Sequence, residues 1–101
     1  MSKVYNAEEI KNLLLPIFLA NAVYRAVLFG SYAKGLATNE SDIDIVIDSK
    51  GELLNINFYG LLEEISTKLG KRVDLIEMTE IQKDSPIYET IQNEGVLLYA
   101  K

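Results

Sequence analysis

Hydrophobic residues along this chain of 101 residues follow two periods in turn, and their alternation predicts a layered α/β domain. Helical segments carry apolar residues three and four positions apart, as at Ile10, Leu13 and Leu14. Strand segments are short β-branched and apolar runs. The predicted helices cover residues 6–20, 31–36, 55–69 and 85–93, and the predicted strands cover residues 24–29, 43–48, 72–78 and 96–100.

Residues that favour helix ends support these boundaries. Asn6 can cap the first helix, with an acid three positions later as in a capping box. Ser85 and Pro86 suit the start of the last helix, whereas Pro16 is expected to kink the first helix or limit its N-terminal part. Helix and strand alternate four times, which predicts one domain over residues 1–101, with helices packed on a mixed or parallel sheet of about four strands.

The charged residues narrow the range of functions. Ten Lys and Arg against fifteen Asp and Glu give a net charge of −5, which argues against direct nucleic-acid binding because few cations are present to displace phosphate counterions. The chain has no Cys and no His, which excludes thiolate zinc sites, histidine metal sites and histidine-dependent triads. Catalysis would therefore depend on carboxylates, lysine, hydroxyls, backbone N–H groups or a metal held by oxygen.

The hydropathy pattern gives no indication of a membrane protein. The longest apolar run covers residues 13–20, whereas a bilayer span needs about 20 residues. No apolar segment directly follows the basic start in the manner of a signal peptide. We therefore expect a cytoplasmic location and no membrane partner.

Gly30 and Ser31 interrupt the chain between a predicted buried strand and a predicted short helix. The first N–H groups of a helix lack backbone partners and, with the helix dipole, bind anions such as phosphates. Gly30 would let the backbone approach a ligand, Ser31 adds a hydroxyl, and Lys34 lies in the next turn. A tight turn with an ordinary cap would explain the same residues without a ligand.

Three acidic residues stand out in the strands. Asp42 and Asp44 lie two positions apart, so their side chains leave the same face with Cα atoms about 6.5–7 Å apart. Two such carboxylates disfavour each other's charge unless a cation lies between them, and Mg²⁺ suits an oxygen-only ligand set. Asp74 shares its face with apolar Ile76 and Met78, where a charge is costly unless it is paired or bound to metal. Solvent exposure, or for Asp74 a salt bridge to a nearby Lys or Arg, is the alternative.

A phosphate-binding turn beside metal-binding carboxylates would suit attack on a nucleoside triphosphate. The order Gly30-Ser31, ten residues, then Asp42-x-Asp44 resembles the minimal nucleotidyltransferase (MNT) group of the DNA polymerase β-type nucleotidyltransferases, and the resemblance extends over about residues 24–99. It implies the fold of that group, which is a single α/β domain with a mixed sheet of about four strands and helices packed on it.

The resemblance also implies roles for the residues. Lys34 stands where many members carry Arg, which keeps the charge but loses the bidentate fork. Asp74 looks like the third carboxylate, which shares a metal and helps to deprotonate the acceptor hydroxyl. By the resemblance, Asp42, Asp44 and Asp74 are the catalytic residues and bind two Mg²⁺ ions, while Gly30, Ser31 and Lys34 bind the nucleotide.

The function implied by the resemblance is Mg²⁺-dependent transfer of AMP from ATP to a hydroxyl. The implied acceptor is a tyrosine of a HEPN-domain toxin encoded beside this protein, which would form a hetero-oligomer with it and be neutralised by it. Two alternatives stay open. The chain could be an antitoxin that acts by binding alone, or an antibiotic-type nucleotidyltransferase that acts on small molecules as a homodimer.

Other polar and aromatic residues are expected to have simpler roles. Tyr32 directly follows Ser31 and could stack on a nucleotide base, although aromatic residues at such positions are more often buried. The remaining acids singled out are expected on solvated faces; they are Glu63, Glu64, Glu77, Glu80 and Glu94.

Overall fold

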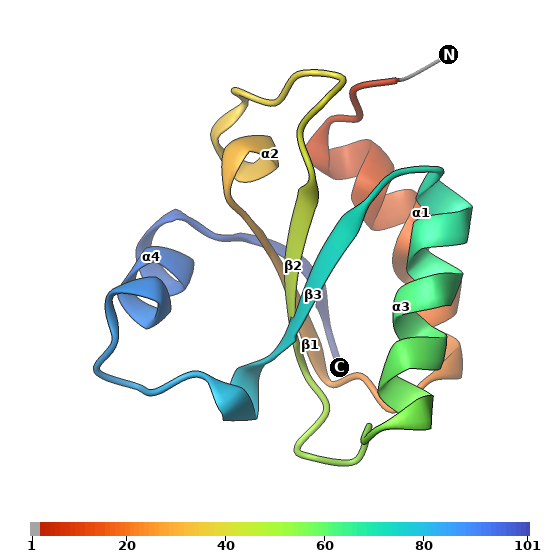
Figure 1. Ribbon diagram of the computed structural model, residues 1–101, viewed down its shortest axis with the longest axis vertical. Helices are drawn as coiled ribbons and strands as arrows, with labels where there is room; N and C mark the ends of the chain where they lie inside the picture. The colour runs from red at the N-terminus through yellow and green to blue at the C-terminus, as the bar shows by residue number, and fades with distance from the viewer. Residues whose placement is uncertain (1–2) are drawn as a thin grey trace.

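A four-stranded sheet with helices on both faces organises residues 3–101, the part of the chain that the computed structural model describes (Figure 1). The eight helices and strands expected from the sequence are all present within this part. In chain order the elements are α1 (Ala7–Ala20), β1 (Arg25–Phe29), α2 (Ser31–Lys34), β2 (Ile43–Asp48), α3 (Ile56–Leu69), β3 (Val73–Glu77), a 3₁₀ turn η1 (Met78–Glu80), α4 (Pro86–Glu94) and β4 (Val96–Ala100).

The sheet is mixed, with strand order β3-β2-β1-β4. Strand β1 is antiparallel to both β2 and β4, whereas β2 and β3 run parallel. A parallel pair needs a crossover connection, and α3 supplies it. Helices α1 and α3 pack side by side on one face of the sheet, and α4 lies on the other face (Figure 1). The expected α/β class with a mixed four-stranded sheet is thus confirmed.

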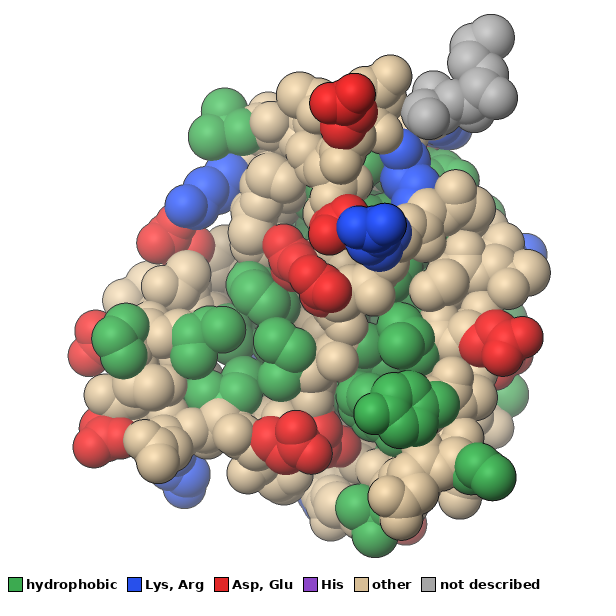
Figure 2. Space-filling view, viewed as in Figure 1, with side chains coloured by type: hydrophobic (Ala, Val, Ile, Leu, Met, Phe, Trp, Pro, Cys, Tyr) green, Lys and Arg blue, Asp and Glu red, His purple; other side chains and the backbone are tan. Residues whose placement is uncertain are grey.

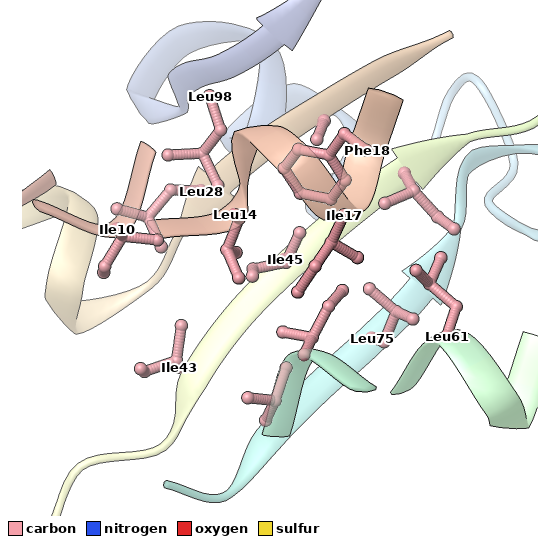
Figure 3. Packing of buried hydrophobic residues seen from close by; sticks show 14 of the residues in the cluster. Ile10, Leu14, Ile17, Phe18, Leu28, Ile43, Ile45, Leu61, Leu75 and Leu98 are labelled. Atoms are coloured by element: carbon pink, nitrogen blue, oxygen red, sulfur yellow. The ribbon is translucent and has the colours of Figure 1, made fainter. Parts of the chain in front are cut away.

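The main core lies between the sheet and the pair α1 and α3. Strand β2 alternates, so that Ile43, Ile45 and Ile47 are fully buried against these helices while Asp44 and Val46 face the α4 side. This alternation fixes the register of β2, because a slip of one residue would bury the acids in the core. Figure 3 shows this packing, in which the labelled residues include Ile10, Leu14, Phe18, Leu28, Leu61, Leu75 and Leu98.

The α4 face of the sheet has a much smaller core. Val27, Val46 and Ile91 are buried there, and apolar side chains around them are only partly covered. One helix of nine residues cannot cover a four-stranded sheet, so part of this face stays open. The partly covered apolar residues are Phe29, Ile76, Met78 and Ile81.

The helix ends agree with the sequence signals, with small differences. Asn6 caps α1 and forms the expected capping box, in which its Oδ1 accepts from the Glu9 N–H at 2.8 Å. Pro16 does not end α1, which continues to Ala20. Helix α2 ends at Lys34, two residues earlier than expected, because Gly35 adopts a left-handed conformation with φ of 72°. In the described part of the chain, no helix is long and apolar enough to cross a membrane.

Glu77 corrects one expectation, because it is only 4% exposed rather than on a solvated face. Its carboxylate accepts hydrogen bonds from the N–H (3.2 and 3.3 Å) and the hydroxyl of Ser49, and the Ser49 Oγ accepts from the Leu53 N–H at 3.2 Å. Glu77 is in phase with Val73 and Leu75, which face the main core, so the strand period was the available signal. The cluster joins the ends of β2 and β3 to the segment before α3.

We predict that Glu77→Ala lowers the free energy of unfolding by about 2–3 kcal/mol, because it leaves the buried donors of Ser49 without an acceptor. Urea denaturation monitored by circular dichroism measures the loss. The exposed Glu80 in η1 is the matched control, and Glu80→Ala should change stability by less than about 0.5 kcal/mol. Equal losses for the two variants would contradict a structural role for the buried carboxylate.

Candidate active site

The strand register brings two of the expected acids together. Asp44 on β2 is the direct partner of Asp74 on the parallel strand β3, although thirty positions separate them in the sequence. On its other side Asp44 pairs with Phe29, the last residue of β1. Gly30 follows Phe29, so the glycine turn begins beside the carboxylates, on the open α4 side of the sheet.

Gly30 lies directly against the Asp44 carboxyl. A Cβ atom added at Gly30 would lie 2.3 Å from the Asp44 Oδ2, closer than any side chain tolerates. The backbone of Gly30 has φ of 72° and ψ of −154°, a region that is essentially restricted to glycine. The position therefore needs glycine both for its conformation and for the carboxylate beside it.

The turn after Gly30 starts α2. The Gly30 carbonyl accepts the first helical hydrogen bonds, from the N–H groups of Ala33 and Lys34 at 3.1 and 3.2 Å. The N–H groups of Ser31 and Tyr32 come before these bonds in the chain, and the leading N–H groups of a helix have no acceptor within the helix. Ser31, which is partly exposed, therefore combines a hydroxyl with a backbone donor next to the acids.

The pKa of Asp44 is raised to about 6. Partial burial is the largest cause, the neighbouring Asp74 carboxyl comes next, and the charge of Asp42 contributes least. Each of these causes disfavours the charged form of the Asp44 carboxyl. A cation bound between Asp44 and Asp74 would remove the penalty, because both carboxylates would then face an opposite charge. The arrangement of the two acids has the electrostatics expected of an oxygen-ligand cation site.

The third expected ligand is less closely placed. Asp42 precedes β2 and is half-buried, whereas Asp74 is exposed on the edge strand β3. Among residues 3–101, no three acidic side chains lie close enough together to form a complete metal-ligand cluster. Mg²⁺ does not need such a cluster, because it is usually bound by one or two carboxylates, water and substrate phosphates. The donor set formed by Asp44 and Asp74, with Asp42 nearby, therefore fits Mg²⁺.

Lys34 forms an ion pair with Glu94, the last residue of α4, at 3.2 Å. Both side chains are about half exposed, so the pair contributes less than about 1 kcal/mol and can exchange for another partner. Glu94 is exposed, as expected from the sequence. Its proximity to Lys34 follows from the pairing of β4 with β1, which no local sequence pattern reveals.

Tyr32 points into the main core rather than toward the turn. It is 5% exposed and belongs to the cluster between the sheet and α1. Its hydroxyl is buried and has no hydrogen-bond partner among the residues that the structure describes. Burial, rather than stacking on a nucleotide base, is therefore the observed role of this side chain.

Comparison with known proteins decides the family. Residues 8–98 match the sequence model of the nucleotidyltransferase domain. The chain belongs to this family. The family resemblance, which rests on the Gly30-Ser31 turn and the Asp42-x-Asp44 spacing, is confirmed. The expectation that the chain is an enzyme, a nucleotidyltransferase, is confirmed as well.

Two relatives match much of the nucleotidyltransferase domain. A protein of Methanocaldococcus jannaschii, provisionally named a protein adenylyltransferase, is 37% identical over 92 residues, which cover 90% of this chain and 96% of the relative. The protein adenylyltransferase MntA of Thermococcus cleftensis is 36% identical over 69 residues, which cover 68% of each chain.

Solved structures share the fold of this nucleotidyltransferase domain. A toxin–antitoxin structure with AMP-PNP has a TM-score of 0.77 at 24% identity, with 90% of this chain and 73% of that chain covered. A complex of a tri-AMPylated Shewanella oneidensis HEPN toxin with its MNT antitoxin has a TM-score of 0.71 at 21% identity, with 94% and 73% covered. The fold is thus that of the minimal nucleotidyltransferases.

We predict that Gly30→Ala lowers the free energy of unfolding by about 3 kcal/mol or more, from a strained backbone and a clash with Asp44 together. Gly35 is the matched control, because it has the same φ of 72° but no atom within 4 Å of an added Cβ, so Gly35→Ala should cost only about 1 kcal/mol. Chemical denaturation measures both.

Asp44→Ala in the Gly30→Ala background removes the clashing carboxyl and should restore part of the lost stability. If Asp44→Ala restores no stability, or if Gly30→Ala and Gly35→Ala lose equal stability, the close approach of Gly30 to the Asp44 carboxyl is contradicted.

Proposed function

We propose that this nucleotidyltransferase domain transfers AMP from ATP to a hydroxyl of a partner protein, with Mg²⁺. The observation that carries the proposal is the pairing of Asp44 with Asp74 beside the Gly30 turn. The relatives named as protein adenylyltransferases support AMP as the transferred group and a protein as the acceptor.

The partner we propose is a HEPN-type toxin encoded beside this protein, with a tyrosine as the acceptor and hetero-oligomer formation as part of the antitoxin function. The similar fold of an MNT antitoxin in complex with a tri-AMPylated HEPN toxin supports this choice. The open α4 face of the sheet also supports a large acceptor, because the acids on it are reached from solvent along the β3 edge.

In the proposed mechanism, Gly30 and Ser31 hold the triphosphate through backbone N–H groups and the Ser31 hydroxyl. The missing side chain at Gly30 lets the turn lie against Asp44, so phosphate and carboxylate groups share one small space. Lys34 reaches a phosphate oxygen after its ammonium leaves Glu94, since the two groups are 3.2 Å apart in this structure.

Asp42, Asp44 and Asp74 would hold Mg²⁺, and their carboxylate oxygens match its ligand preference. When bound, the ion supplies charge neutralisation at the phosphate oxygens and lowers the pKa of a coordinated hydroxyl. Asp44, which is half-buried, would bind the metal while its carboxyl lies against the Gly30 turn. The exposed Asp74 would face the side from which the acceptor arrives.

In the proposed reaction, the acceptor hydroxyl replaces pyrophosphate on the α-phosphorus of ATP. The acceptor hydroxyl oxygen forms a bond to the α-phosphorus of ATP, and the bond from that phosphorus to the bridging oxygen breaks. Pyrophosphate leaves with the electron pair. The hydroxyl proton passes to the carboxylate of Asp74 and then to solvent.

We predict that ATP binds at least tenfold more weakly, by about 1.4 kcal/mol, in EDTA than with Mg²⁺, and that Asp44→Asn causes a similar loss. Isothermal titration calorimetry measures both. Asp84→Asn, in the exposed loop before α4, makes the same charge change away from the site and should bind ATP like the parent chain. Equal ATP affinity with and without EDTA would contradict a metal-dependent site.

The decisive test of the function is intact-mass spectrometry of the purified chain with ATP, Mg²⁺ and the protein encoded next to it. We expect that protein to gain one or more AMP units, and we expect Asp42→Asn/Asp44→Asn to abolish the gain. A stable complex without any gain would favour neutralisation by binding alone. If the neighbouring protein neither gains mass nor forms a complex, the proposal of a protein acceptor is overturned and small molecules become the candidate acceptors.

A further inference from the structure

A hollow opens on the α4 side of the sheet, at the opposite end of the strands from the Gly30 turn. It has a volume of about 440 Å³ and lies between the start of β1, the end of β2, η1 and α4. Arg25, Asp48, Met78, Lys83 and Tyr88 are among its lining residues. None of these residues has a role in the nucleotide site described above.

The hollow carries an excess of positive charge in a chain whose net charge is −5. Arg25 and Lys83 are its two cations, and neither forms an ion pair within the described range 3–101. Asp48 is the single carboxylate in the lining and is the direct strand partner of Arg25. Its Oδ1 already accepts a hydrogen bond from the Lys50 N–H at 2.9 Å. The charge of the hollow therefore complements an acidic group.

An apolar surface connects this hollow to the paired acids. Phe29, Ile76 and Met78 are only partly buried between the two places, and Figure 2 shows hydrophobic side chains gathered there beside acidic ones. Asp48 follows Asp44 by four residues on β2, so the hollow lies about 13 Å from the reactive centre at a rise of about 3.3 Å per residue. An extended peptide covers the same distance with four residues.

We infer that the α4 face binds an extended acidic segment of the acceptor protein, with an acidic residue in the hollow about four positions from the hydroxyl that receives AMP. The inference rests on the proposed function, because it specifies the acceptor of the same reaction. Arg25 and Lys83 are specificity-determining residues in this arrangement, and the apolar surface accommodates the residues between the two anchored positions.

Synthetic ten-residue peptides with one tyrosine test the inference. One set carries Glu four positions before or after the tyrosine, and the matched set carries Gln there. Mass spectrometry after incubation with the full chain, ATP and Mg²⁺ gives the rate of AMP transfer. We expect at least tenfold higher kcat/KM for one of the Glu peptides at low salt, carried by a lower KM, and a smaller preference in high salt.

Arg25→Gln/Lys83→Gln should abolish the preference for Glu over Gln while ATP affinity stays within twofold of the parent value. Lys11→Gln/Lys68→Gln, which removes two exposed cations from α1 and α3, makes the same charge change on the other face and should keep the preference. Melting temperatures of both double variants show whether any loss comes from unfolding.

The outcomes separate this inference from the proposed function. Equal modification of Glu and Gln peptides would overturn the acidic specificity while leaving AMP transfer to proteins in place. Weaker ATP binding in Arg25→Gln/Lys83→Gln would overturn it by assigning the hollow to the nucleotide. Modification of the neighbouring protein but of none of the peptides would overturn the extended segment, and modification of neither would overturn the proposed function itself.

Discussion

The contact between Gly30 and the Asp44 carboxyl links the site to the rest of the fold. It exists because β1 and β2 pair with Phe29 opposite Asp44, so that the turn leaving β1 closes over this carboxyl. That register depends in turn on Ile43 and Ile45, which are fully buried against α1 and α3. The packing of the core therefore determines where the carboxylate and the glycine turn meet, and neither can move independently of the other.

The unequal covering of the two sheet faces is what leaves the site accessible. Two helices of fourteen residues cover one face, whereas a single helix of nine residues covers part of the other. A strand that alternates apolar and acidic residues can bury its apolar side chains on one face only if the face that carries the acids stays partly open to water. The side of the sheet with the smaller core is consequently the side with the paired acids and the hollow at Arg25.

Local features of this fold could be predicted from the sequence, and features that depend on strand order could not. The cap at Asn6 and the alternation of Ile43 to Asp48 are local patterns, and the structure has both. The charge of Glu77 predicts a solvated position, whereas its phase with Val73 and Leu75 predicts the buried position that the structure shows. The ion pair of Lys34 with Glu94 has no such signal, since it requires β4 to lie beside β1.

The charge distribution explains how an acidic chain can suit a polyanionic substrate. Partial burial and the neighbouring Asp74 carboxyl raise the pKa of Asp44 to about 6, because two charged carboxylates at this place are electrostatically unfavourable. In the proposed function, ATP would bring further negative charge to the same place, which would make its binding without a cation still less favourable. A divalent cation reverses both penalties at once, because it is attracted to the carboxylates and to the phosphates. In the proposed function, the mutual repulsion of the acids would make nucleotide binding conditional on the metal, and Lys34 would add its charge only after Glu94 releases it.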